Sequence, residues 1–183
     1  MLVGGGAGLG GELCSAGQVR TPVPTRTGAI IGIISDTHGL LRPEALAALL
    51  DSDYIIHAGD IGNPAILKKL EGIAPVTAIR GNVDREAWAK KLPATNVLEV
   101  GGIFIYVLHN LRDIDLKPEG AGFSIVVSGH SHVPRQETKN GVLYFNPGSA
   151  GPRRFQLPVT IGRLTVNDRK VAGEIVEIVP GFE

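Results

Sequence analysis

The sequence predicts an α/β fold built from two sheets with flanking helices. From residue 29 to about residue 80, short apolar runs alternate with amphipathic segments. This alternation is typical of strand–helix–strand units in a parallel sheet with right-handed crossovers. After about residue 93, strand-like segments follow one another directly and are separated by turn signals. The 183 residues suffice for one ordinary domain with its own core.

The first half of the pattern contains three expected strands and two expected helices. The strands are predicted at residues 29–35, 54–58 and 76–80, and the unbroken apolar run of the first indicates burial on both faces. The helices are predicted at residues 43–50 and about 63–70, each with a proline near its first turn. Apolar side chains recur along one side of each helix, so both helices should pack on the sheet.

The second half of the pattern is expected to consist of strands. These strands are predicted at residues 96–100, 103–108, 124–128, 134–139, 142–145, 159–166 and 170–179. Their turn signals are two-residue hairpin sequences, at Gly101-Gly102, Asn140-Gly141 and Asn167-Asp168.

Residues 1–28 differ from the rest because they are rich in glycine and proline. We expect a flexible tail there, followed by one domain at residues 29–183. The segment lacks both a basic start and a sustained apolar stretch, so it is a poor match to a signal peptide. A phosphate-binding loop at residues 4–6 is the alternative, but no strand is predicted before it and no helix after it.

The composition narrows the class of function. Eighteen basic residues balance eighteen acidic residues, which gives no global electrostatic argument for binding long nucleic acid or a membrane. No apolar run is long enough to span a bilayer. The single cysteine, Cys14, excludes an internal disulfide and a thiolate-rich metal site, and it favours a cytoplasmic location.

The most informative feature is a set of polar side chains that follow the expected strands. They are Asp36, His38, Asp60, Asn82, His109, His130 and His132. The first three strands should share a parallel sheet, so the residues that follow them should lie along one edge, where ligands bind in such sheets. Periodicity alone does not show that the later histidines reach the same point.

These seven side chains suit two metal ions. Asp36 and His38 are two residues apart, as are His130 and His132, so in extended backbone both members of each pair would project to the same side. Two carboxylates, four imidazoles and an amide oxygen supply two ions if one carboxylate bridges them. Each motif alone has an ordinary explanation, such as a capped turn, but the ordered set favours a metal site. His57, within an apolar strand, is interpreted as structural.

The ordered motifs resemble the calcineurin-like metallophosphoesterase superfamily. They are Asp-x-His at 36–38, Gly-Asp at 59–60, Gly-Asn-x-Asp at 81–84, a lone His109, Gly-His-x-His at 129–132 and Asn-Pro-Gly-Ser at 146–149. The resemblance covers residues 30 to about 179 and is strongest to the small bacterial and archaeal phosphodiesterases, which share a fold with the scaffold subunit of retromer.

The resemblance implies a two-sheet sandwich with helices outside, in α/β/β/α layers. It also implies two metal sites that share Asp60: one formed by Asp36, His38, Asp60 and His132, the other by Asp60, Asn82, His109 and His130. Asp84 would orient a ligand histidine. Manganese is the expected metal, with zinc, iron, nickel and magnesium as alternatives.

The activity implied by the resemblance is hydrolysis of a small phosphodiester by a hydroxide that bridges two divalent ions. Asp60, Asn82 and Asp84 are the expected catalytic residues. Many larger relatives have a histidine that protonates the leaving group where this chain has Val83, so diesters or activated esters are favoured over alkyl monoesters. Asn110 replaces a glycine that usually follows the lone histidine; glycine tolerates backbone angles that asparagine visits less often, although asparagine is the best other residue for a positive φ.

Two other functions stay open. A non-catalytic scaffold could use the same fold to bind partner proteins, but it would not need all seven ligands. A nucleotide or nucleic-acid phosphoesterase is the third hypothesis, although sparse aromatic residues argue against long nucleic acid. Arg153 and Arg154 could contact a phosphate oxygen, but exposed loop arginines are usually only solvated. A homodimer is implied by resemblance alone.

Overall fold

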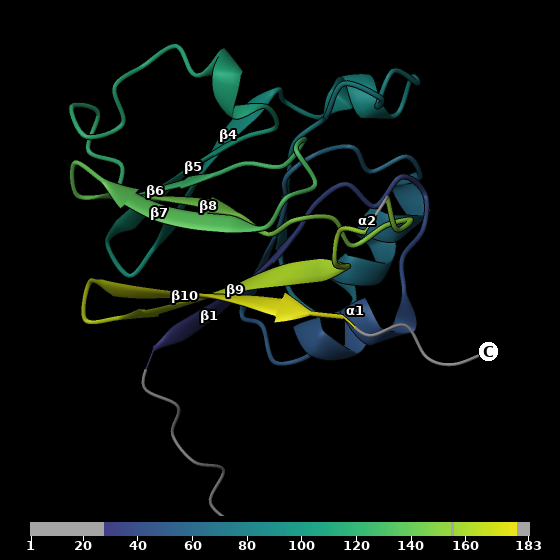
Figure 1. Ribbon diagram of the computed structural model, residues 1–183, viewed down its shortest axis with the longest axis horizontal. Helices are drawn as coiled ribbons and strands as arrows, with labels where there is room; N and C mark the ends of the chain where they lie inside the picture. The colour runs from purple at the N-terminus through teal and green to yellow at the C-terminus, as the bar shows by residue number, and fades with distance from the viewer. Residues whose placement is uncertain (1–27, 155, 179–183) are drawn as a thin grey trace, which may run out of the picture.

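The computed structural model describes residues 28–154 and 156–178, which form two five-stranded sheets and a few helices. Figure 1 shows the two sheets stacked one on the other, with the helices α1 and α2 beside the sheet that contains β1. The expected tail lies outside the described residues except for Gly28, and so do Cys14 and the alternative phosphate loop. None of the described helices has the length and apolar character needed to cross a membrane.

The first sheet is mixed and has the order β10-β9-β1-β2-β3. Its strands are β1 (Ala29–Ile34), β2 (Tyr54–His57), β3 (Val76–Ala78), β9 (Thr160–Asn167) and β10 (Lys170–Glu177). As predicted, the first three strands run parallel, while the C-terminal hairpin adds two antiparallel strands beside β1. The carboxyl ends of β1, β2 and β3 therefore lie at one edge.

Two helices cover the outer face of this sheet. They are α1 (Pro43–Leu49) and α2 (Pro64–Glu71), each with proline in its first turn. Their buried residues pack with outward-facing strand residues in one apolar cluster. Asn63 caps α2 by accepting a hydrogen bond from the backbone N–H of Ala65 at 2.9 Å.

The second sheet has the order β4-β5-β6-β8-β7. Its strands are β4 (Thr95–Val100), β5 (Ile103–Leu108), β6 (Ile125–Val127), β7 (Arg135–Lys139) and β8 (Val142–Asn146). The predicted hairpins β4–β5 and β7–β8 are antiparallel, but β5, β6 and β8 run parallel in the centre. The carboxyl ends of β5 and β6 thus also point the same way.

The core lies between the sheets, and it confirms the predicted two-sheet α/β fold. Fully buried aliphatic side chains from β1, β2, β5 and β6 interlock there with Phe145 of β8. The outer face of the second sheet carries little helix in the described residues. It is partly covered by the 3₁₀ helix η2 (Leu111–Asp113) and a loop that packs Ile114, Leu116 and Phe123 on it. Another short 3₁₀ helix, η1 (Ala89–Lys91), precedes β4.

The hairpin turns follow the predicted chemistry with one shift. Asn140 and Gly141 have φ of 51° and 79°, as a type I′ turn requires. In the C-terminal hairpin the two left-handed residues are Asp168 and Arg169, with φ of 47° and 62°. The turn centre therefore lies one residue later than the predicted Asn167-Asp168, because the strand continues through Asn167.

Candidate metal centre

The structure brings all seven expected ligands together, where the carboxyl ends of the parallel strands of both sheets meet. Residues after β1, β2 and β3 supply Asp36, His38, Asp60 and Asn82, and residues after β5 and β6 supply the other three. Each of the seven lies within 4 Å of another member of the set. The later histidines, whose position could not be predicted from periodicity, therefore reach the same point as the other ligands.

One half of the centre joins Asp36, His38 and His132. Nε2 of His132 lies 3.3 Å from Oδ1 of Asp36 and 3.4 Å from Nε2 of His38. The two imidazole rings are stacked, with centroids 5.2 Å apart and an interplanar angle of 17°. These three side chains offer one ligand atom each within 4.8 Å of one another, which is a spacing that a single ion can span.

The other half joins Asp60, Asn82, His109 and His130. Nε2 of His109 lies 3.3 Å from Oδ2 of Asp60 and 3.1 Å from Oδ1 of Asn82. Nδ1 of His130 lies 3.0 Å from the same Asn82 oxygen. Oδ2 of Asp60 is also 3.9 Å from Nε2 of His38, so Asp60 stands between the two halves. Asp36 also belongs to both halves, because its carboxylate lies within 4.8 Å of ligand atoms of Asp60 and His109 as well.

Hydrogen bonds fix the loops that carry these side chains. The turn after β1 is tied to the loop after β2 by backbone bonds from Asp36 to Gly59 and from His38 to Asp60, at 3.0 and 2.9 Å. The loop after β6 is tied to the end of β5 by a bond from Gly129 to His109. A side chain at Gly129 would collide with the Ser35 hydroxyl, so this close approach requires glycine.

Five of the seven expected ligands adopt left-handed backbone conformations. They are Asp36, His38, Asp60, His130 and His132, with φ between 46° and 68°. The prediction that each i, i+2 pair sits on extended backbone is therefore wrong, although both members of each pair do reach the centre. Left-handed conformations cost free energy in residues other than glycine and cluster at functional sites.

The arrangement of hydrogen-bond acceptors fits divalent cations. Nδ1 of His109 faces the Ala58 carbonyl at 2.7 Å, so Nδ1 must carry the proton and donate it. In neutral His109, Nε2 is then an acceptor that faces two more acceptors, on Asp60 and Asn82. Oδ1 of Asp36 is likewise buried without a hydrogen-bond partner among the described groups. A cation among these lone pairs satisfies them, and nitrogen and oxygen ligands suit manganese, iron or zinc.

Burial and neighbouring charges shift the pKa values of these groups. Burial raises the pKa of Asp36 to about 6, although the Ser35 hydroxyl partly offsets this. Burial also lowers the pKa of His132 to about 4, and the charge of Arg154 adds to the effect. For Asp60, burial acts to raise the pKa. A hydrogen bond from His109, which Nε2 donates only when the imidazole is protonated, and one from the Val83 amide outweigh burial, and the pKa is lowered. A cation beside Asp36 would favour its ionised form.

Asp84 has different partners from those expected. Its carboxylate is 5% exposed and accepts hydrogen bonds from the backbone N–H groups of Ile61, Gly62 and Gly81, at 2.9 to 3.0 Å. No hydrogen bond or ion pair joins it to a histidine among the described residues, so the structure gives no contact that would orient a ligand histidine. Asp84 instead ties the loop after Asp60 to the turn before Asn82.

The two departures from the family pattern have local explanations. Asn110 has φ of −108°, so this position does not require glycine, and its side chain caps η2 by accepting from the Arg112 N–H at 3.1 Å. The side chain of Val83 is 44% exposed, while its N–H donates to Oδ1 of Asp60 at 3.0 Å. A branched apolar side chain therefore stands beside the centre.

Several supporting residues were not identified from the sequence. The Ser35 hydroxyl donates to Oδ2 of Asp36 at 2.6 Å, and Ser149 donates to the Asp36 carbonyl at 3.0 Å. Asn146 donates to the Gly129 carbonyl at 2.7 Å. The Asn-Pro-Gly-Ser turn thus braces the loops that carry Asp36 and His130, and its sequence was the signal that could have revealed this role.

Of the two loop arginines, only Arg154 reaches the centre. Its Nη2 lies 3.3 Å from Nε2 of His38. Arg153 is exposed. His57, interpreted as structural, is fully buried and its Nε2 lies 2.9 Å from the Thr37 hydroxyl. Because that hydroxyl donates to the Ile61 carbonyl, it accepts from His57, and Nε2 of His57 therefore carries the proton.

With the geometry established, comparison with known proteins identifies the family. Residues 30–169 match the calcineurin-like phosphoesterase superfamily domain. The chain belongs to this superfamily. A probable metallophosphoesterase of Methanothermobacter thermautotrophicus is 32% identical over 162 residues, which cover 80% of this chain and 91% of the relative.

Solved structures agree with this membership of the calcineurin-like phosphoesterase superfamily. An archaeal phosphodiesterase is 25% identical, with a TM-score of 0.67 over 80% of this chain and 99% of the other. Vacuolar protein sorting 29 from Cryptosporidium parvum has a TM-score of 0.66 over 83% of this chain and 98% of its own, at 19% identity, and shows the shared fold. The superfamily is generally hydrolytic and uses divalent metals, and the Asp and His groups described above could hold them.

Proposed function

We propose that the chain is a phosphodiesterase that binds two divalent ions at the candidate metal centre. Manganese is the metal that we expect there. The observation that supports this most is the contact between Oδ2 of Asp60 and Nε2 of His109 at 3.3 Å, where two acceptors face each other when His109 is neutral. Asp36, His38, Asp60 and His132 would hold one ion, and Asp60, Asn82, His109 and His130 the other.

Hydrogen bonds orient the two carboxylate ligands, Asp36 and Asp60. Oδ2 of Asp36 is occupied by Ser35 and the His130 N–H, which leaves Oδ1 directed at His132. Oδ1 of Asp60 is occupied by the Val83 N–H, which leaves Oδ2 directed at His109. Such bonds orient ligands before the metal arrives.

The reaction proposed is hydrolysis of a phosphodiester. Bound divalent ions would activate water as the nucleophile and neutralise charge on the phosphoryl oxygens. Asn82 directs its oxygen at two imidazoles, so its NH₂ group is available to donate to a phosphoryl oxygen. Arg154 can neutralise a second oxygen. Val83 cannot protonate a leaving group, which favours leaving groups that depart as stable anions.

A non-catalytic scaffold is the competing function, because vacuolar protein sorting 29 has the same fold. Turnover distinguishes the two. We expect wild-type protein to hydrolyse bis(4-nitrophenyl) phosphate with added manganese, to act more slowly on 4-nitrophenyl phosphate, and to lose both activities with a chelator.

Variants connect that activity to this centre. Asp60→Asn and His130→Ala should each abolish diester hydrolysis. Asp168→Asn is a matched control, because Asp168 also has a left-handed φ, 47° against 54° for Asp60, but lies in the β9–β10 turn. Full activity in both site variants would contradict the proposed site, and metal binding without any turnover in wild type would favour the scaffold.

A further inference from the structure

A cavity of about 1060 Å³ opens beside the candidate metal centre. It lies on the outer face of the second sheet, the face that has only η2 and a loop over it in the described residues. Its walls come from β7, β8, the turn after β6 and the segment 110–114. This volume exceeds what a phosphate or a nitrophenyl group would fill and lies just above the usual range of small-molecule sites, roughly 300 to 1,000 Å³.

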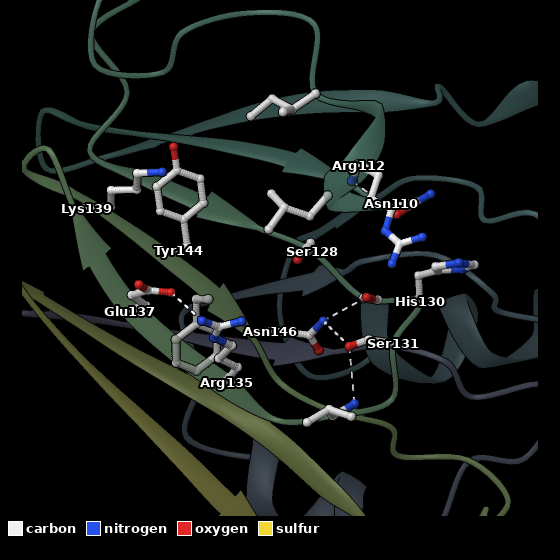
Figure 2. A pocket seen from close by; sticks show the side chains of 15 residues that line it. Asn110, Arg112, Ser128, His130, Ser131, Arg135, Glu137, Lys139, Tyr144 and Asn146 are labelled. Atoms are coloured by element: carbon white, nitrogen blue, oxygen red, sulfur yellow. Dashed lines mark hydrogen bonds and ion pairs between the residues drawn. The ribbon is translucent and has the colours of Figure 1, made fainter.

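The cavity is continuous with the centre. His130 lines it while its Nδ1 lies 3.0 Å from Asn82, and Asn110, which follows His109, lines the same wall. In Figure 2, His130, Asn110 and Arg112 lie at one end, and Tyr144 and Lys139 lie at the other. A molecule in the cavity would therefore begin at the metal centre and extend away from it.

Strand register sets the order of groups along the cavity. Arg135, Glu137 and Lys139 of β7 alternate onto one face, opposite Asn146, Tyr144 and Val142 of β8. Arg135 and Lys139 are four residues apart, which corresponds to roughly 13 Å of strand. Passing outward from the centre, a ligand would meet Arg135, then the half-buried ring of Tyr144, then Lys139.

The cavity is positively charged although the whole chain is neutral. Arg112, Arg135 and Lys139 line it against the single carboxylate of Glu137. Glu137 pairs with Arg135 at 2.7 Å, and both are largely exposed. Across the described part of the chain, neither Arg112 nor Lys139 forms an ion pair. The positively charged side chains of Arg112 and Lys139 are thus available to a ligand, one at each end of the cavity.

We propose that this cavity binds one ester arm of the substrate, and that this arm carries a flat ring and at least one further phosphate. A short oligonucleotide with a 5′-phosphate has this chemistry: a base could stack on Tyr144 while Lys139, at the outer end, contacts the additional phosphate and the charge of Arg112 adds to the positive potential of the cavity. The proposal rests on the proposed function, since it assigns a substrate class to the same centre.

The reaction balances with one water molecule. Its oxygen forms the new bond to phosphorus, while the bond from phosphorus to the leaving oxygen breaks. One proton of the water passes to the leaving oxygen. The products are one phosphomonoester and one alcohol, and the cavity holds whichever of them carries the ring and the additional phosphate.

The test compares the dinucleotide pApA with ApA, which lacks the 5′-phosphate. With manganese present, wild type should show a kcat/KM at least about fivefold higher for pApA, the effect expected of partly exposed charge pairs. The variant Arg112→Glu/Lys139→Glu should lose this preference and keep its activity on bis(4-nitrophenyl) phosphate. Lys69→Glu, an exposed lysine on α2, is the matched control and should keep the preference.

A binding measurement keeps the test independent of turnover. Adenosine 3′,5′-bisphosphate should bind wild type more tightly than adenosine does, and the double variant should reduce the difference. Tyr144→Leu should weaken binding of the bisphosphate at least about fivefold through lost stacking.

The outcomes separate the two proposals. Bisphosphate binding that depends on Arg112 and Lys139, without hydrolysis of any diester, would support the cavity and overturn the phosphodiesterase. Hydrolysis of the nitrophenyl diester with equal kcat/KM for pApA and ApA would overturn the cavity proposal. Equal binding of the bisphosphate and adenosine would overturn it as well.

Discussion

Arg154 directs its guanidinium at the same histidine nitrogen that faces the metal centre, with Nη2 3.3 Å from Nε2 of His38. The two residues are 116 positions apart in the sequence. The contact brings a permanent positive charge to the edge of a site built from carboxylates and imidazoles, where a phosphoryl group would carry negative charge.

Replacing Arg154 should therefore weaken substrate binding. Arg154→Ala should raise KM for bis(4-nitrophenyl) phosphate about tenfold, as expected for a lost hydrogen bond to a charged group, with a smaller effect on kcat. Steady-state kinetics in saturating manganese measures this. Arg153→Ala is the neighbouring control and should leave KM unchanged, and equal effects of the two variants would remove the assignment to Arg154.

Val83 should slow the hydrolysis of diesters whose leaving group is an alkoxide, dinucleotides among them. A histidine there would add a proton donor beside the centre, so Val83→His should raise the rate on a dialkyl phosphodiester, whose leaving group is an alkoxide, by at least about tenfold. The same substitution at Val97 on β4, which is 47% exposed against 44% for Val83, is the control. A rate unaffected by Val83→His, measured by product analysis, would show that leaving-group protonation is not limiting.

Asp84 should stabilise the loops and only indirectly affect the metals. Asp84→Asn removes charge from three backbone donors and places an amide N–H₂ against one of them, which should lower the free energy of unfolding by about 3 kcal/mol. Metal affinity should fall about tenfold, as for other residues that support ligands. Denaturant unfolding and metal titration measure both, with the exposed Asp115→Asn as control.

His57 should make stability depend on pH. Burial lowers its pKa to about 3 from the ordinary value of 6.5, so the unfolded chain binds a proton that the folded chain does not. The contribution of neutral His57 to the free energy of unfolding is present above pH 6.5 and is lost as the pH falls toward 3. The loss is about 1.5 kcal/mol between pH 6.5 and pH 5. His57→Gln should be less stable at pH 7 but lose less on acidification. Parallel pH profiles for the two proteins in urea unfolding would contradict this.

Local patterns made the elements and the ligands predictable. Apolar runs, prolines at helix starts and turn dipeptides such as Asn140-Gly141 are short-range signals, and the structure has an element at each. The ligands followed because residues after parallel strands share a sheet edge, as Asp36 and Asp60 do.

Long-range pairing was not predictable in the same way. Nothing in the alternation of β9 shows that it pairs with β1 and not with the second sheet, and nothing in β5 shows that it runs parallel to β6. The left-handed conformations of His130 and His132 depend on contacts with other loops, such as the bond from the His130 N–H to Asp36. Arg154 and the cavity likewise arise only from tertiary packing.

The amount of metal bound by each variant tests the central claim most directly. Equilibrium dialysis with manganese, followed by elemental analysis, should find two ions per wild-type chain, one in His132→Ala and one in His109→Ala, with Asp168→Asn unchanged. Wild-type protein that binds no ion, or the same two ions in both histidine variants, would contradict the account.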